Sequence, residues 1–107
     1  MNLLNAAISI AGAGDNTIIA APGATTVIKI HRLIISNGVA TAQAVIAKDG
    51  AATNLTGAMA LPTSVGGLIE LMQGEDAPLW TLSQNNAFIL NLAAATSVTG
   101  FVSYSLG

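Results

Sequence analysis

The sequence has 107 residues, the usual size of one domain, and contains no cysteine, which excludes disulfides, a thiolate metal site and a cysteine nucleophile. Charged residues make up 7% of the chain, against about 25% in an ordinary soluble domain. With three cations and a net charge of -2, the chain lacks the positive charge that nucleic-acid binding requires. A surface with so little charge favours self-association or membership of an assembly.

Short runs rich in Ile, Val, Thr and Leu, separated by turn residues, predict an all-β fold. The first two runs are residues 6–10 and 17–20, and the glycines of residues 11–16 indicate a tight turn between them. We interpret residues 1–5 as an arm that is free or exchanged between copies. Pro22-Gly23 is a turn dipeptide that ends this part of the chain.

The longest β-rich run spans residues 26–37 and ends at the turn signal Asn37-Gly38. Strict alternation places Ile28, Ile30 and Ile34 on one face. Arg32 breaks that apolar face, so we expect either a bulge or an exposed strand end there. The opposite face would carry Lys29, His31, Leu33 and Ile35.

The second half of the chain continues in the same way, with Asp49-Gly50 as a hairpin dipeptide and residues 83–86 as a turn. Eight or nine short strands predict an antiparallel β-sandwich in Greek-key or jelly-roll order. We assign one domain, with residues 14–107 as the sandwich and residues 1–13 as its N-terminal arm and first strand. The remaining predicted strands are residues 42–48, 55–61, 67–72, 79–82, 87–93 and 97–106.

We expect no catalytic residue, no cofactor and no metal. His31 is the sole histidine, and no spacing in the sequence supplies it with a nucleophile or an orienting carboxylate. The acids are scattered apart from the adjacent Glu75 and Asp76. We interpret these two as a solvated connection, with a calcium site as the alternative.

Two aromatic residues have more than one interpretation. Trp80 is either a core or edge packing residue, an interface anchor, or a platform for a sugar. Phe101 falls on the face of its strand opposite Val98 and Val102. It therefore faces either another layer of the protein or a partner.

No membrane span or export signal is expected. Residues 77–107 carry no charge, but polar residues interrupt every apolar run before it reaches the length of a span. Residues 1–13 lack the Lys or Arg of a signal peptide.

Four segments resemble a family of small tailed-bacteriophage virion proteins, namely GDNTIIAA (residues 14–21), LTGAMAL (55–61), NAFILNL (86–92) and TSVTGFV (96–102). The resemblance implies a β-sandwich that decorates or cements the capsid, usually as a trimer seated where subunits of the major capsid protein meet. The chain departs from that family at Thr25-Thr26, where a basic pair is expected, and in a more hydrophobic run at residues 67–72.

The sequence therefore predicts a structural virion protein, a homotrimer made in the host cytoplasm that binds the major capsid protein on the capsid surface. The alternatives are a trimeric receptor-binding or fibre-tip module, which needs a longer attachment segment, and a small lectin, which needs stacked aromatics. The residues predicted to contact partners are Lys29, His31, Arg32, Glu75, Asp76, Trp80 and Phe101.

Overall fold

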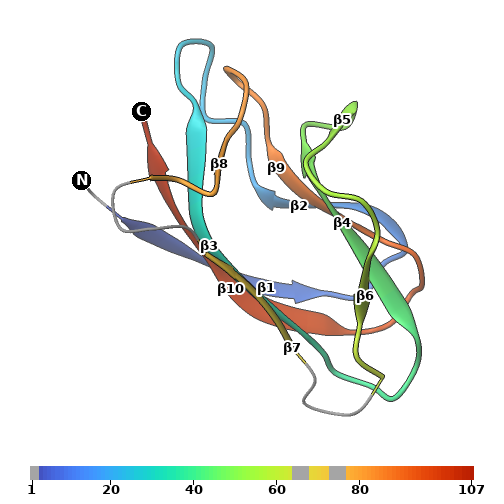
Figure 1. Cartoon of the computed structure of the whole chain (residues 1–107). Coiled ribbons are helices and arrows are strands. Elements are labelled where there is room, and N and C mark those ends of the chain that lie inside the picture. Colours follow the sequence, from blue (N-terminus) through green and yellow to red (C-terminus); the bar gives the residue numbers. More distant parts are fainter. Residues whose placement is uncertain (1–2, 64–67, 73–76) are drawn as a thin grey trace.

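The computed structural model describes residues 3–63, 68–72 and 77–107, and this part of the chain is all-β. Two antiparallel sheets pack face to face, as the sequence predicts (Figure 1). The strands are β1 (Leu4–Ile10), β2 (Gly14–Ile19), β3 (Ile28–Asn37), β4 (Gln43–Asp49), β5 (Thr53–Asn54), β6 (Met59–Leu61), β7 (Leu68–Met72), β8 (Trp80–Thr81), β9 (Phe88–Leu92) and β10 (Val98–Leu106).

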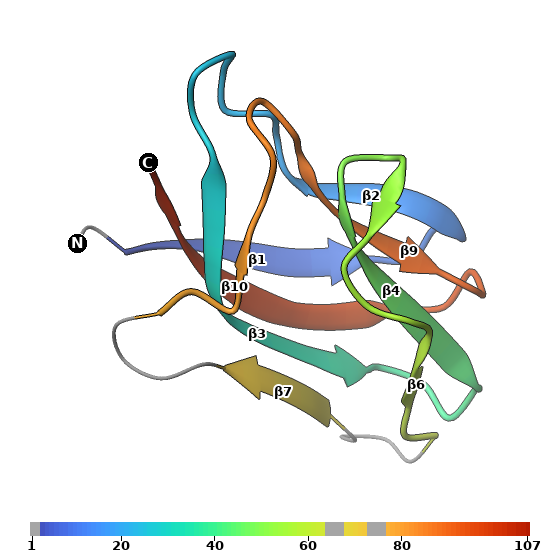
Figure 2. The same cartoon turned by 45° about the horizontal axis from the view of Figure 1, so that its top comes forward.

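Sheet A has the order β1-β10-β3-β7, and sheet B has the order β2-β9-β4-β5. Strand β8 pairs with β3 beyond the end of β7, and β6 pairs with β4 beyond the end of β5. Each of these couples therefore occupies one strand position, so the described residues form eight strand positions, within the predicted range. The chain passes between the sheets in jelly-roll order, staying in sheet B from β4 to β6 and in sheet A from β7 to β8, and Figure 2 shows β1, β10, β3 and β7 side by side.

Strand β3 contains the bulge that Arg32 indicated. Ser103 of β10 pairs with Arg32, but the next residue, Tyr104, pairs with Ile30, so His31 is the extra residue on β3. Beyond the bulge, each side chain of β3 points to the face opposite to the one that strict alternation predicts. Leu33 and Ile35 therefore face the core, and the predicted inward position of Ile34 is wrong.

The core lies between the inner faces of the two sheets. From sheet A it receives the inward residues of β3 and β10, and from sheet B it receives Val45 of β4 and Phe88, which are fully buried. Each large apolar side chain buried in this way contributes about 1.5–3 kcal/mol. Since no disulfide is present, this packing provides most of the free energy of folding.

The hairpin predicted at Asp49-Gly50 is present between β4 and β5, and Gly50 has a positive φ of 67°. Asp49 is buried and accepts hydrogen bonds from the backbone N–H of Ser83 (3.1 Å), the Ser83 hydroxyl (3.0 Å) and Asn86 Nδ2 (3.0 Å). The carboxylate thereby fastens the turn at residues 83–86 to this hairpin.

Other boundaries differ from the prediction. The run at residues 55–61 is not one strand, because only Met59–Leu61 forms a strand. Thr56 interrupts the regular pairing with β4: its Oγ1 accepts a hydrogen bond from the Ala47 N–H at 3.1 Å, and its own N–H donates to the Ala47 carbonyl at 3.3 Å. Strand β2 already begins at Gly14, in the segment predicted as a turn. Asn37-Gly38 does not form a hairpin, since the chain there passes from sheet A to sheet B.

The beginning of the described chain is part of sheet A. Strand β1 pairs with β10 along its whole length, from Leu4 opposite Tyr104 to Ile10 opposite Val98. Leu4 and Asn5, which we interpreted as part of a free arm, belong to this strand. Among the residues described, no helix has the length and apolarity that crossing a membrane requires.

Candidate protein-interaction surface

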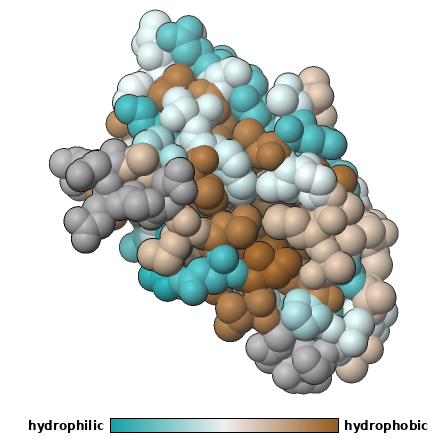
Figure 3. Space-filling model, viewed as in Figure 1, coloured by the Kyte–Doolittle hydropathy of each residue, from teal (hydrophilic) through white to brown (hydrophobic). Residues whose placement is uncertain are grey.

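Exposed apolar side chains lie on sheet A in two groups, one on β7 and the other where β1 begins and β10 ends. The large apolar residues with the greatest exposure in the described ranges are Leu68 (55%) and Met72 (59%) on β7, Leu3 (53%) and Leu4 (36%) at the start of β1, and Leu106 (49%) at the end of β10. In the space-filling view, hydrophobic side chains gather around β7 and continue toward β6, with hydrophilic ones among them (Figure 3). The described part of sheet B carries no comparable group.

The outer face of sheet A, the side turned away from sheet B, is arranged in rows across the strands. One row runs from Ala7 through Phe101 and Ile34 to Glu70, and the row beside it joins Ser103, Arg32 and Met72. We call the apolar and charged members of these rows, together with Leu68, the outer patch. The outer patch consists of Arg32, Ile34, Leu68, Glu70, Met72 and Phe101.

Arg32 connects the outer patch. Its Nε donates to Glu70 Oε2 at 2.8 Å, its Nη2 contacts the same oxygen, and its Cζ lies 5.8 Å from the centroid of the Phe101 ring. The side chains of Arg32 and Glu70 remain 42% and 38% exposed. The two charges therefore compensate each other inside an accessible apolar area, although an exposed pair of this kind adds at most about 1 kcal/mol to stability.

His31 and Lys29 lie on the same face, next to the outer patch. His31 Nε2 lies 2.8 Å from Ser105 Oγ, so the fold supplies the hydroxyl that no sequence spacing indicated. In the described chain, the imidazole has no other hydrogen-bond partner. The described residues around His31 therefore include no second group that would orient the ring as a general base. Lys29 lies opposite Ser105 in the register of β3 and β10.

Trp80 does not lie with these residues. It pairs with Ile30, whose side chain is fully buried, so both side chains point between the sheets. The ring of Trp80 packs against the core, with its centroid 6.2 Å from that of Phe88. The geometry thus corresponds to the packing interpretation of this residue.

Glu75 and Asp76 lie outside the described residues, and so does the calcium site considered for them. In the ranges that the structure does describe, no three His, Asp or Glu side chains approach each other closely enough to hold a metal ion. Those ranges also enclose no pocket.

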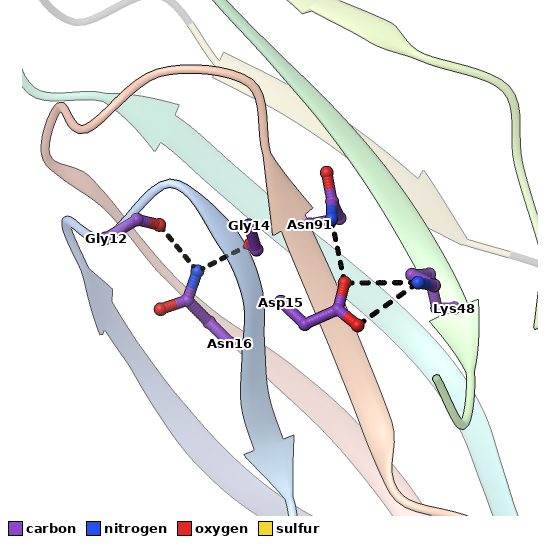
Figure 4. A network of polar contacts seen from close by, with 6 residues as sticks. All are labelled: Gly12, Gly14, Asp15, Asn16, Lys48 and Asn91. Atoms are coloured by element: carbon purple, nitrogen blue, oxygen red, sulfur yellow. Dashed lines mark hydrogen bonds and ion pairs between the residues drawn. The ribbon is translucent and has the colours of Figure 1, made fainter. Parts of the chain in front are cut away.

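The outer face of sheet B has a different character. Asp15 of β2 accepts hydrogen bonds from Asn91 Nδ2 (2.7 Å) and Lys48 Nζ (3.1 and 3.2 Å), so one carboxylate ties β2, β9 and β4 together (Figure 4). The hydrogen bonds of Asn91 and Lys48 lower the pKa of Asp15 below its ordinary value of 3.8. These three polar side chains satisfy one another, whereas sheet A presents apolar groups to the outside.

Comparison with known proteins adds no family to these observations, because no family model and no curated protein matches the chain.

The sequence interpretation left out four members of the outer patch, namely Ile34 on β3 and three residues of β7, Leu68, Glu70 and Met72. Their alternation in the run LIELM is a usable signal, since residues two apart share one face of a strand. Ile34 could not be found in the same way, because the bulge at His31 reverses the direction of every later side chain on β3.

Proposed function

We propose that this protein is a structural virion protein that decorates the outer surface of a bacteriophage capsid as a homotrimer and stabilises it by binding the major capsid protein. The observation that carries the proposal is that Leu68 and Met72, the most exposed large apolar side chains of the described residues, lie with Phe101 on the outer face of sheet A. Two further features support it, the sequence segments that resemble such decoration proteins and a chain with 7% charged residues.

The outer patch has the composition of a binding surface. Aromatic residues, Met and Arg are enriched in protein interfaces, and here Phe101, Met72 and Arg32 occupy adjacent rows of one face. A decoration protein needs no cleft, since a trimer that binds by several equivalent patches gains avidity from modest individual contacts.

The first test mixes the purified protein with capsids that lack their minor proteins and measures bound copies and heat resistance of the shell. We expect saturation at a fixed ratio and a higher temperature of capsid disruption. In Phe101→Ala the affinity should fall about tenfold, as for an interface residue that contributes about 1.4 kcal/mol. Thr17→Ala is the matched control, because Thr17 is exposed on β2 of sheet B.

Three results would contradict the proposal. They are absence of capsid binding by the wild type, equal loss in Thr17→Ala and Phe101→Ala, and binding to host cells or glycans in place of capsids. The last of these would favour the receptor-binding or lectin class.

A further inference from the structure

Sheet A has two open edges. On the path β1-β10-β3-β7, strand β7 pairs with β3 alone and β1 pairs with β10 alone. No loop or turn of the described chain donates to or accepts from the backbone of either strand on its free side. Unpaired strand edges are templates for another strand, and natural proteins usually protect them with Lys, Pro or a bulge. Strands β1 and β7 contain no Lys, Pro or bulge, and the one charge on them, Glu70, is paired with Arg32.

The backbone directions show which groups are free. The inward residues Ile28 and Ile30 of β3 direct their carbonyls toward the side of β7 and β8, where they accept hydrogen bonds from Leu82 (2.9 Å) and Leu79 (2.6 Å). The direction of the backbone groups alternates along a strand, so the inward residues of β7 direct their N–H and C=O groups toward β3. The N–H and C=O groups of the outward residues of β7 are left free. These outward residues are Leu68, Glu70 and Met72.

The same alternation applies across β10 to β1, where the outward residues Asn5, Ala7 and Ser9 have free backbone groups. The path contains an even number of strands, so its two edge strands run in opposite directions, as the arrows of β1 and β7 show (Figure 2). A second copy in the same orientation can therefore place β1 beside β7 as a regular antiparallel pair.

Two conditions define the register of that pair. The inward and outward faces must match, and all five residues of β7 must find partners within β1, Leu4–Ile10. A single antiparallel register meets both conditions. It places Leu68 opposite Ser9, Glu70 opposite Ala7 and Met72 opposite Asn5.

The side chains agree with this register. The outward residues of β1 are small or polar and uncharged, so they leave room for the larger residues of β7. Glu70 meets Ala7, and its charge is already compensated by Arg32. In a symmetric pairing of β7 with itself, centred on the strand, Glu70 would face its own copy, and like charges directly opposite each other destabilise a sheet.

We propose that β7 of one copy pairs with β1 of the next copy in this register, so that the A sheets of three copies join edge to edge in a closed ring. The number three rests on the proposed function. The contact itself rests on the open edges and on the register described above. A pairing of two different edges is heterologous, and such a contact can close into a ring with an odd number of copies, whereas a two-fold contact gives pairs.

The absence of cysteine from the chain makes a direct test possible. Single variants Leu68→Cys and Ser9→Cys are mixed and oxidised, and so are Met72→Cys and Asn5→Cys. Opposed residues of an antiparallel pair lie about 5.5 Å apart between Cα atoms, within reach of a disulfide. Within one copy β10 and β3 separate the two positions by about 14 Å, so a disulfide must join two copies.

We expect each matched mixture to give a covalent dimer, while each variant alone and the mismatched mixture of Leu68→Cys with Asn5→Cys give little. Sedimentation of the wild type should show a trimer. Cross-linking of a single variant by itself, equal cross-linking in the mismatched mixture, or a trimer without cross-links would overturn the edge pairing. A monomeric wild type would do the same.

Capsid binding by the wild type separates the two proposals. Capsid binding without matched cross-links removes the edge pairing and leaves the decoration function intact. Matched cross-links without capsid binding support the edge pairing and remove the decoration function.

Discussion

Gly100 of β10 lies where the backbone of β3 comes close. It has a φ of +152°, and a Cβ at this position would meet the carbonyl oxygen of Ile34 at 1.9 Å. We expect Gly100→Ala to lower the free energy of unfolding by more than about 2 kcal/mol, because the clash involves backbone that cannot rotate away. Gly57→Ala, which meets nothing within 4 Å, should change it by less than about 0.5 kcal/mol in urea unfolding. Equal effects would show that the close approach is not required.

Asp15 makes stability depend on pH in the acid range. Hydrogen bonds from Asn91 and Lys48 lower its pKa below 3.8 in the folded state. The folded state then binds fewer protons than the unfolded state, so the stabilisation is complete above pH 3.8 and is lost as the pH falls through the folded pKa.

This gives a measurable difference between wild type and Asp15→Asn. The advantage of the wild type in unfolding free energy should be constant near neutral pH and shrink as the pH is lowered below 3.8. Urea unfolding at a series of pH values checks this. An advantage that does not change down to the acid unfolding transition would contradict the assigned direction of the pKa shift.

At the scale of elements, the bulge of β3 explains both a success and an error of the sequence analysis. A charged residue in an apolar strand face predicted the irregularity at Arg32. Its consequence for Leu33 and Ile35 was missed, because a sequence does not show which residue is extra until the partner strand is known. The strand order itself was not predicted; the sequence narrowed it to Greek-key or jelly-roll order, since many short strands with turn signals have few ways to close.

The candidate surface shows the same limit. Lys29, His31, Arg32 and Phe101 were chosen by chemical type, and the fold does place them on one face. Trp80 was chosen in the same way, but its pairing with Ile30 turns it inward. The direction of a lone aromatic on a two-residue strand depends on its pairing with a distant strand, which local periodicity does not contain.

The bulge leads to a prediction about deletions. Removing His31 leaves Ile28, Ile30, Leu33 and Ile35 in strict alternation, so the strand can pair with β10 without a bulge. We expect this deletion to preserve cooperative unfolding, with the loss of the hydrogen bond to Ser105 as its main cost. Deletion of Ile34 should abolish cooperative unfolding, because Ile35 and Asn37 would then point away from the core. Cooperative unfolding of both deletions, or of neither, in circular dichroism melts would contradict this reading of the bulge.

At the scale of the whole molecule, the self-association that we propose should respond weakly to salt. The proposed contact joins an uncharged β1 to a β7 whose one charge is paired with Arg32. Raising NaCl from about 0.05 M to about 1 M shortens the Debye length from about 14 Å to about 3 Å, yet the trimer dissociation constant should change less than about threefold. Sedimentation at several salt concentrations measures this, and dissociation at high salt would indicate an ionic contact.

The pairing of β1 with β10 also has a consequence for synthesis on the ribosome. The Ser103 hydroxyl donates a hydrogen bond to Asn5 across 98 residues of sequence. Strand β1 therefore cannot pair until β10, the last strand of the sandwich, has left the ribosome. Long loop closures of this kind slow folding. Until translation has passed residue 106, β3 and β1 lack the strand that lies between them, and the nascent chain has two further unpaired edges. Copies translated close together on one message would be exposed to strand exchange at this stage.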